Sequence, residues 1–196
     1  MNTNLNQTAT LSRRSLTTRR ITFDALFAAL YVVFACLISI KASIVEISFA
    51  SFPVIFSAFL LGPVDAVLVA LVGSFIEQCM TFGLTATTPL WMLGPVLQGL
   101  AVGLLVRLLP VFRNGVSGRA RLAAAIGVVC VGELILSVFN TAALYLDGWI
   151  VGYPVKALHL IVIPRLVNCA FRTAICCVLT RFLLPPAQKL FTMRKN

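Results

Sequence analysis

Residues 122–146 read LAAAIGVVCVGELILSVFNTAALYL, and Glu133 is the one charged side chain among them. A helix needs about 20 mostly apolar residues to cross the hydrocarbon core of a bilayer, and this stretch is longer. The rest of the chain has the same character, since 60% of its 196 residues are apolar and only 11% are charged. An average soluble domain carries roughly 25% charge, and a chain of this length cannot hide so much apolar surface from water. The sequence therefore predicts an all-α integral membrane protein.

Further apolar stretches lie on both sides of this one. They are residues 21–40, 44–61, 62–82, 89–109 and 157–184, and Phe52 is an alternative start for the second of them. Gly62-Pro63 separates the second from the third, and Pro185-Pro186 follows the last. The second stretch is the weakest, because residues 45–52 alternate in polarity as an extended segment does. It leaves five spans instead of six if it forms only a re-entrant hairpin.

The basic residues decide between five and six spans, because lysine and arginine collect on the cytoplasmic side of a membrane. Three groups flank the spans: Arg13, Arg14, Arg19 and Arg20; Arg107, Arg113, Arg119 and Arg121; and Arg181, Lys189, Arg194 and Lys195. With six spans all three groups are cytoplasmic, whereas five spans would put the last two on opposite sides. The sequence therefore predicts a six-helix membrane domain over residues 19–186. Residues 1–18 are predicted to be a disordered cytoplasmic tail, and residues 187–196 a second cytoplasmic tail.

Several functional classes are disfavoured by what the sequence lacks. The net charge of +10 comes from short groups beside the spans, not from one basic face, so we expect no nucleic-acid binding. There is no Walker A, H-E-x-x-H or G-x-S-x-G motif, and His159 is the only histidine. The six cysteines show no metal-binding spacing. We therefore expect no metal site and no cofactor, and binding or permeation in place of catalysis.

Polar side chains inside membrane spans are costly and are candidates for function by default. Glu77 lies late in residues 62–82, near the predicted outer side, and Asn140 and Asn168 add amide groups to the last two spans. Arg165 follows Pro164 near the outer end of the last span, where an external ligand can reach its guanidinium. We therefore predict that Arg165, Glu77, Asn168 and Asn140 bind a ligand.

Structural ion pairing is the alternative interpretation of these charges. Glu133 lies near the middle of its span, and Arg172 lies two turns after Arg165 on nearly the same helix face. Glu77 either pairs with an arginine of the last span or accepts hydrogen bonds from a ligand. Asp65, at the inner end of its span, is expected to stabilise a helix N-terminus through the helix dipole.

Two aromatic residues and one group of alanines complete the candidates. Trp91 and Phe49 lie at the predicted outer side and form either part of an interfacial belt or the wall and lid of a site for a flat ligand. Ala25, Ala28 and Ala29 lie in the first span, and Ala25 and Ala29 have the small-xxx-small spacing that lets two membrane helices approach closely. Internal packing is the alternative for these alanines.

Three stretches together resemble a known family. They are residues 19–30 (RRITFDALFAAL), residues 47–73, which run from ISF through LGP to VALVG, and residues 163–168 (IPRLVN). The pattern over about residues 19–185 resembles the S component, or substrate-binding membrane subunit, of an energy-coupling factor (ECF) vitamin importer. The last stretch is most similar to the folate-type members.

The resemblance implies a six-helix bundle in a bacterial cell membrane, with both termini in the cytoplasm. It implies capture of a vitamin from outside in a site that the loop between the first two helices closes. Ala25, Ala28 and Ala29 would then dock onto a membrane coupling subunit that two cytoplasmic ATPase subunits drive, and the S component would topple and release its ligand inside. The residues alone leave open a stand-alone secondary transporter or channel and, less readily, an intramembrane enzyme.

Overall fold

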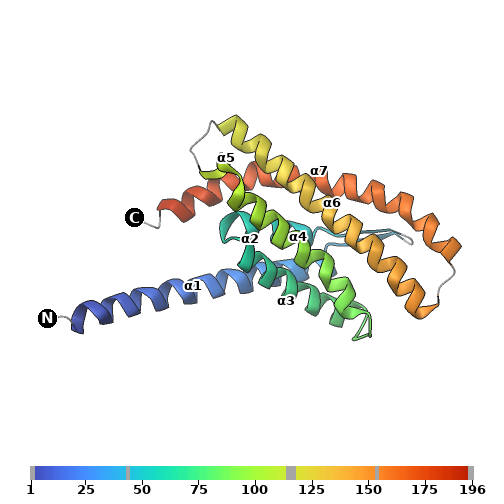
Figure 1. Ribbon diagram of the computed structural model, residues 1–196, viewed down its shortest axis with the longest axis horizontal. Helices are drawn as coiled ribbons and strands as arrows, with labels where there is room; N and C mark the ends of the chain where they lie inside the picture. The colour runs from blue at the N-terminus through green and yellow to red at the C-terminus, as the bar shows by residue number, and fades with distance from the viewer. Residues whose placement is uncertain (1–2, 43–44, 114–117, 153–154, 194–196) are drawn as a thin grey trace.

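The computed structural model describes residues 3–42, 45–113, 118–152 and 155–193, nearly all of them helical (Figure 1). The elements are α1 (Thr3–Cys36), β1 (Ile40–Ala42), β2 (Val45–Ile47), α2 (Ser51–Leu60), α3 (Pro63–Thr81), α4 (Thr88–Leu108), α5 (Pro110–Arg113), α6 (Gly118–Val151) and α7 (Val155–Met193). The long helices lie side by side in one elongated bundle. The start of α1 and the end of α7 lie at the same end of it.

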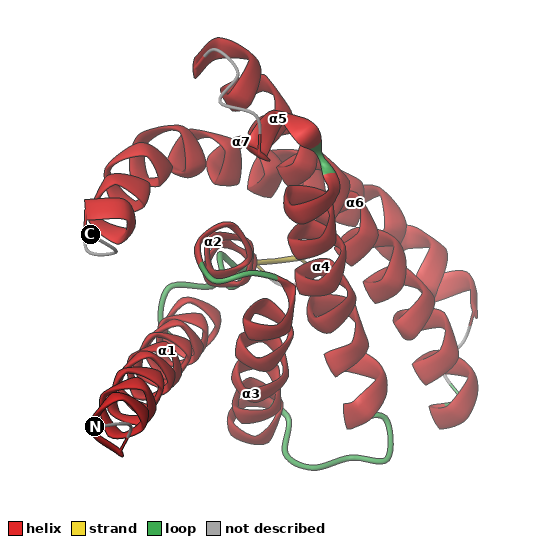
Figure 2. Ribbon diagram, turned by 60° about the vertical axis from the view of Figure 1, so that its left-hand side comes forward, coloured by secondary structure: helices red, strands yellow, loops and turns green. Residues whose placement is uncertain are grey.

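Helix α2 occupies the centre of the bundle, between α1, α3, α4 and α7 (Figure 2). Eight of its residues are buried: Ser51, Phe52, Pro53, Val54, Ile55, Ser57, Ala58 and Phe59. The Phe56 ring stacks on Phe52 with a centroid distance of 5.3 Å and meets the Phe27 edge from α1 at 6.0 Å. At a rise of about 1.5 Å per residue, so short a helix covers only about half of the hydrocarbon core. Therefore α2 is a core helix of the bundle.

Within the part of the chain that the structure describes, four helical segments are long and apolar enough to cross a membrane: Pro63–Thr81, Thr88–Leu108, Gly118–Val151 and Arg165–Pro186. This confirms the prediction of an α-helical membrane protein. The apolar part of α1 begins only after Arg19 and Arg20 and contains Asp24, and α2 is short, so the count of six spans stays a prediction.

The link between α1 and α2 is a small antiparallel hairpin of β1 and β2, with Ile40 opposite Ile47 and Lys41 opposite Glu46. The extended character expected around residue 45 is therefore confirmed for Val45–Ile47. A helix start at residue 44 is wrong, because the helix begins only at Ser51, within one residue of the alternative start at Phe52. β2 packs against α7, so the hairpin lies against the bundle.

The two terminal helices are longer than the sequence predicts. Helix α1 begins at Thr3, so most of the stretch predicted to be a disordered tail is helical, and this part extends beyond the bundle (Figure 1). Helix α7 continues through Pro185 and Pro186 to Met193. A proline removes one backbone donor and crowds the preceding turn, which kinks a helix without necessarily ending it. The predicted end at residue 184 is therefore wrong.

Glycines let α4 approach its two neighbours. A Cβ atom at Gly103 would lie 2.4 Å from the Cα atom of Pro63 in α3, and one at Gly99 would lie 2.9 Å from the carbonyl oxygen of Ala66. On the other side, a Cβ at Gly132 of α6 would lie 2.5 Å from Cγ2 of Val102. Such close crossings are typical of membrane helices, where small residues replace the missing hydrophobic driving force.

We expect Gly103→Ala to destabilise the protein by roughly 1–3 kcal/mol, the usual cost of overpacking a core. The reason is that the added methyl group meets the backbone of Pro63, which cannot rotate away. Gly127→Ala is the matched control, because a Cβ at this helical glycine meets nothing within 4 Å. Thermal unfolding in one detergent compares the two variants with wild type. Equal midpoints for both would contradict the close α3–α4 crossing.

Candidate functional site

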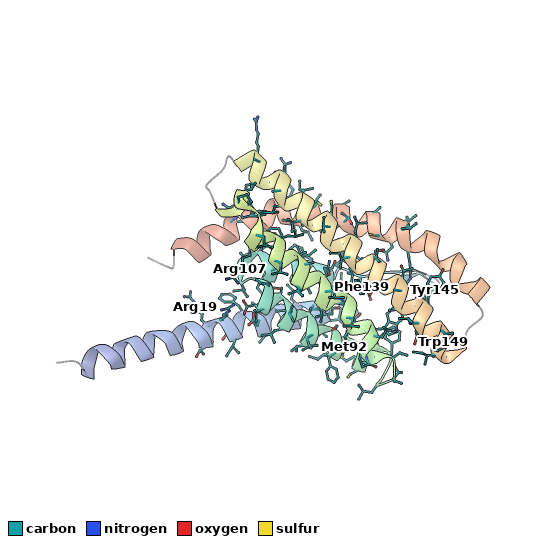
Figure 3. The ribbon with its side chains drawn as sticks, in the orientation of Figure 1. Arg19, Met92, Arg107, Phe139, Tyr145 and Trp149 are labelled. Carbon is teal, nitrogen blue, oxygen red and sulfur yellow. The ribbon has the colours of Figure 1, made fainter. Side chains whose placement is uncertain are left out.

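The charged and aromatic side chains divide the bundle into two ends. Arg19 and Arg107 lie at the end that holds the termini, whereas Met92, Tyr145 and Trp149 lie at the opposite end (Figure 3). This is the distribution that the positive-inside rule and the interfacial preference of tryptophan predict. We call the end with Trp149 the outer end, after the orientation that the sequence predicts; that orientation itself stays a prediction.

Three predicted site residues come together from three helices near the outer end. Arg165 of α7 donates a hydrogen bond from Nη1 to the backbone oxygen of Asn140 in α6, at 2.7 Å. Its guanidinium carbon also lies 5.8 Å from the ring centroid of Trp91 in α4, which is a cation–π contact. Gly94 makes room for this arrangement, because a Cβ there would lie 2.4 Å from Oδ1 of Asn140.

Two contacts hold the Arg165 guanidinium: the Asn140 carbonyl oxygen binds one Nη group, and the Trp91 ring lies near the guanidinium carbon. Among the described residues, no carboxylate pairs with it, so its charge is not consumed by a structural ion pair. A guanidinium presents planar donors that fit a carboxylate with two parallel hydrogen bonds. Asn168 lies three residues further along α7 on the same helix face and is half-buried. The group therefore combines an aromatic ring with a cation, and Asn168 adds an amide on the same face of α7.

Glu77 contacts α1 through Tyr31. The Tyr31 hydroxyl donates a hydrogen bond to Oε2 of Glu77 at 3.0 Å, and Tyr31 is only 3% exposed. Gly73 lets the Tyr31 ring pack on α3, since a Cβ there would lie 2.7 Å from the ring. The expected pairing of Glu77 with an arginine of the last span is not among the ion pairs of the described residues, where Arg172 pairs with Glu133.

Phe49 is half-buried in the short link between the hairpin and α2, and its carbonyl oxygen accepts a hydrogen bond from the backbone nitrogen of Phe52 at 3.0 Å. Its role in ligand contact stays a prediction. The alanines of α1 divide into two sets. Ala25 and Ala29 are exposed, whereas Ala28 is buried at 6% exposure and packs inside the bundle. This burial favours internal packing, the alternative interpretation, for Ala28, and the docking role of the alanines stays a prediction.

A second polar cluster lies in the middle of the bundle around Glu133, which is 0% exposed. Its Oε2 accepts a hydrogen bond from Nε of Arg172 at 2.5 Å, and its Oε1 accepts one from Nε2 of Gln98 at 3.1 Å. The Cys176 thiol lies 3.7 Å from the same Oε1. The ion-pair interpretation of Glu133 and Arg172 is thereby confirmed. Burying such a pair costs desolvation free energy, and the hydrogen bonds to both partners offset part of that cost.

Asp65 has a more specific role than the helix dipole alone. It lies in the first turn of α3, as the dipole argument requires, and its two oxygens accept hydrogen bonds from Nε and Nη2 of Arg20. This hydrogen bonding raises the pKa of the Arg20 guanidinium. The pair ties the middle of α1 to the first turn of α3.

Sequence reasoning missed Gln98, Tyr31 and Arg20 as partners in these clusters. Gln98 carried a usable signal, because an amide in the middle of residues 89–109 is as unusual in a membrane span as Asn140 or Asn168. Tyr31 and Arg20 carried none. Tyrosine is common near membrane interfaces, and Arg20 belongs to a basic group that membrane orientation already explains.

The chain is similar to known proteins over most of its length. A family model described as "ECF transporter, substrate-specific component" matches residues 19–184. A solved structure titled "Structure and mechanism of the S component of a bacterial ECF transporter" is 18% identical, with a TM-score of 0.57, and the match covers 86% of this chain and 97% of that one. At this identity the second likeness concerns the fold alone. No curated protein matches the chain.

The family match confirms the resemblance carried by residues 19–30, 47–73 and 163–168. It also confirms the prediction of a transport subunit in place of an enzyme, because this family consists of substrate-specific transporter components. Together with the apolar helices, it confirms a membrane location.

Proposed function

The chain belongs to the family of ECF transporter substrate-specific components, and from this premise we propose that it captures a vitamin or related micronutrient, best a folate-type compound, from outside a bacterial cell. In this proposal it is the high-affinity binding subunit of an ATP-driven importer in the cytoplasmic membrane. Both termini are cytoplasmic, in agreement with the basic residues at that end of the bundle (Figure 3).

The observation that carries the proposal is the meeting of Arg165, Trp91 and Asn140 near the outer end of three helices. A flat ring system stacks on an indole, and a carboxylate accepts two hydrogen bonds from a guanidinium. Folate-type vitamins combine a flat ring system with carboxylates, so they suit this pair of groups. Asn168, Glu77 and Phe49 are proposed as further contacts.

The proposal includes partners, because the sequence holds no Walker A motif with which to use ATP. A membrane coupling subunit would dock on the exposed alanines of α1, Ala25 and Ala29, and two cytoplasmic ATPase subunits would supply the energy. The S component would then topple in the membrane and release its ligand inside. Exposure of both alanines on the surface of the bundle supports this part of the proposal.

We expect Arg165→Lys to weaken ligand binding by about 1.5–3 kcal/mol, the contribution of a hydrogen bond to a charged group. Lysine keeps the positive charge but loses the planar pair of donors. Calorimetric titration of purified wild type and variant with folic acid measures the change. Arg181→Lys is the matched control, because Arg181 is an exposed arginine further along α7. If both variants bind as wild type does, Arg165 is outside the ligand site.

A further inference from the structure

Arg172 uses only part of its guanidinium within the protein. Its Nε donates to Glu133 at 2.5 Å, and the side chain is 12% exposed. Among the described residues, this is the one hydrogen bond that the group makes, so the donors of both Nη atoms stay available. In this it differs from Arg20, whose Nε and Nη2 both donate to Asp65.

The free edge of Arg172 is not sealed inside the protein. Gln98 Oε1 and Thr180 Oγ1 are examples of fully enclosed polar atoms that lack a partner, and the Nη atoms of Arg172 are not among these. An arginine so deep in a membrane domain is costly unless its donors are used. The accessible edge therefore points to an acceptor supplied from outside the protein.

A chain of side chains from three helices fixes the direction of this arginine. Gln98 of α4 donates to one oxygen of Glu133 in α6, and the other oxygen holds Nε of Arg172 in α7. Gln98 and Glu133 are both 0% exposed, so neither has room to change its position freely. Glu133 accepts a hydrogen bond from Nε of Arg172 only. This bond fixes the direction of the edge formed by Nη1 and Nη2.

Arg172 lies seven residues after Arg165 on α7. At 3.6 residues per turn this places the two arginines on nearly one face, about 10 Å apart along the helix axis. Arg165 keeps donors beyond the Nη1 group that binds Asn140. The two guanidiniums therefore lie on one face of α7, that of Arg165 near the outer end and that of Arg172 in the middle of the bundle.

We infer that Arg172 is a second ligand-contact residue, held in place by Glu133 and Gln98, and that the ligand is an elongated molecule with hydrogen-bond acceptors at both ends. This rests on the proposed function of binding a micronutrient and deepens it. Arg165 receives one end of the molecule beside Trp91, and Arg172 receives the end that enters deeper. Glu133 acts as a positioning residue through Arg172.

The test compares Arg172→Lys with wild type in purified full-length protein. Lysine keeps a positive charge for Glu133, so folding is retained, but it cannot present the free planar edge. We expect affinity for folic acid to fall at least tenfold at an unchanged unfolding temperature. We expect the amount of small molecule retained from cells grown in rich medium to fall in the same proportion, and this second measurement does not depend on the identity of the ligand.

The outcomes separate this inference from the proposed function. If Arg165→Lys weakens binding and retention but Arg172→Lys changes neither, the inference is overturned and the proposed function stands. A further outcome is that wild type binds no folic acid but retains another small molecule. In that case, lower retention by Arg172→Lys supports the inference, and retention equal to that of wild type overturns it. If wild type retains and binds nothing, both the inference and the proposed function fail.

Chemical labelling of wild type covers the case in which Arg172→Lys does not fold. Phenylglyoxal reacts with the two Nη atoms of an arginine, and mass spectrometry of peptides locates the product. We expect Arg172 to be labelled in ligand-free protein in lipid nanodiscs and to be protected in protein that keeps its small molecule. An unlabelled Arg172 in the ligand-free protein would overturn the inference, because its free edge would then be closed.

Discussion

Replacing Ala29 with tryptophan is expected to reduce uptake to background while the isolated protein still binds its ligand. Ala29 is exposed on α1, and a bulky side chain there prevents close approach of a partner helix. Ala25→Trp is expected to act in the same way. Uptake is measured in cells that also express the coupling module, and binding is measured on the purified variant.

Two further residues serve as controls. Leu134 is 59% exposed and lies on α6, away from the small-residue stripe of α1, so Leu134→Trp should transport normally. Ala28 is buried, so Ala28→Trp should lower the unfolding temperature instead of acting on uptake alone. Normal uptake by both Ala25→Trp and Ala29→Trp would show that this face of α1 contacts lipid and no coupling subunit.

Glu133→Ala is expected to destabilise the fold by about 3–5 kcal/mol, the cost of removing one partner of a buried ion pair. The substitution leaves the Arg172 charge without its carboxylate and removes the acceptor of the Gln98 amide. Thermal unfolding of the purified variants measures the loss.

The matched control replaces both members of the pair with leucine. Two apolar side chains leave no unpaired charge, so the double variant should recover most of the lost stability. Unfolding of Glu133→Ala at the wild-type temperature would contradict the buried pair. A double variant less stable than Glu133→Ala would show that the pair itself stabilises the fold.

The boundaries of helices that begin at local sequence signals, such as Gly-Pro and Thr-Pro pairs, were predicted closely. The predicted ranges 62–82 and 89–109 agree with α3 and α4 within one residue at every end. The reason is that Gly62-Pro63 and Thr88-Pro89 are local helix-start signals. The short α2 could not be predicted in this way. Its length depends on the hairpin before it and on burial between four helices, which are tertiary facts.

The candidate site shows the same division between local and tertiary information. The depth of Arg165, Trp91 and Asn140 in their spans follows from counting residues, and all three were predicted and found together. The depth of a charged residue in its span does not predict which residue it pairs with. Glu133 and Arg172 lie on different helices, and only the packing of α4 brings Gln98 to them. In α1, helical period alone did not separate buried Ala28 from exposed Ala25 and Ala29.

The decisive measurement is mass spectrometry of the small molecules released from gently purified wild-type protein. We predict one compound in near-stoichiometric amount, with a flat ring system and acceptor groups at both ends, and less of it from Arg165→Ala protein prepared in the same way. Release of no compound, or of an equal amount from the Arg165→Ala protein, would contradict a micronutrient site built on Arg165.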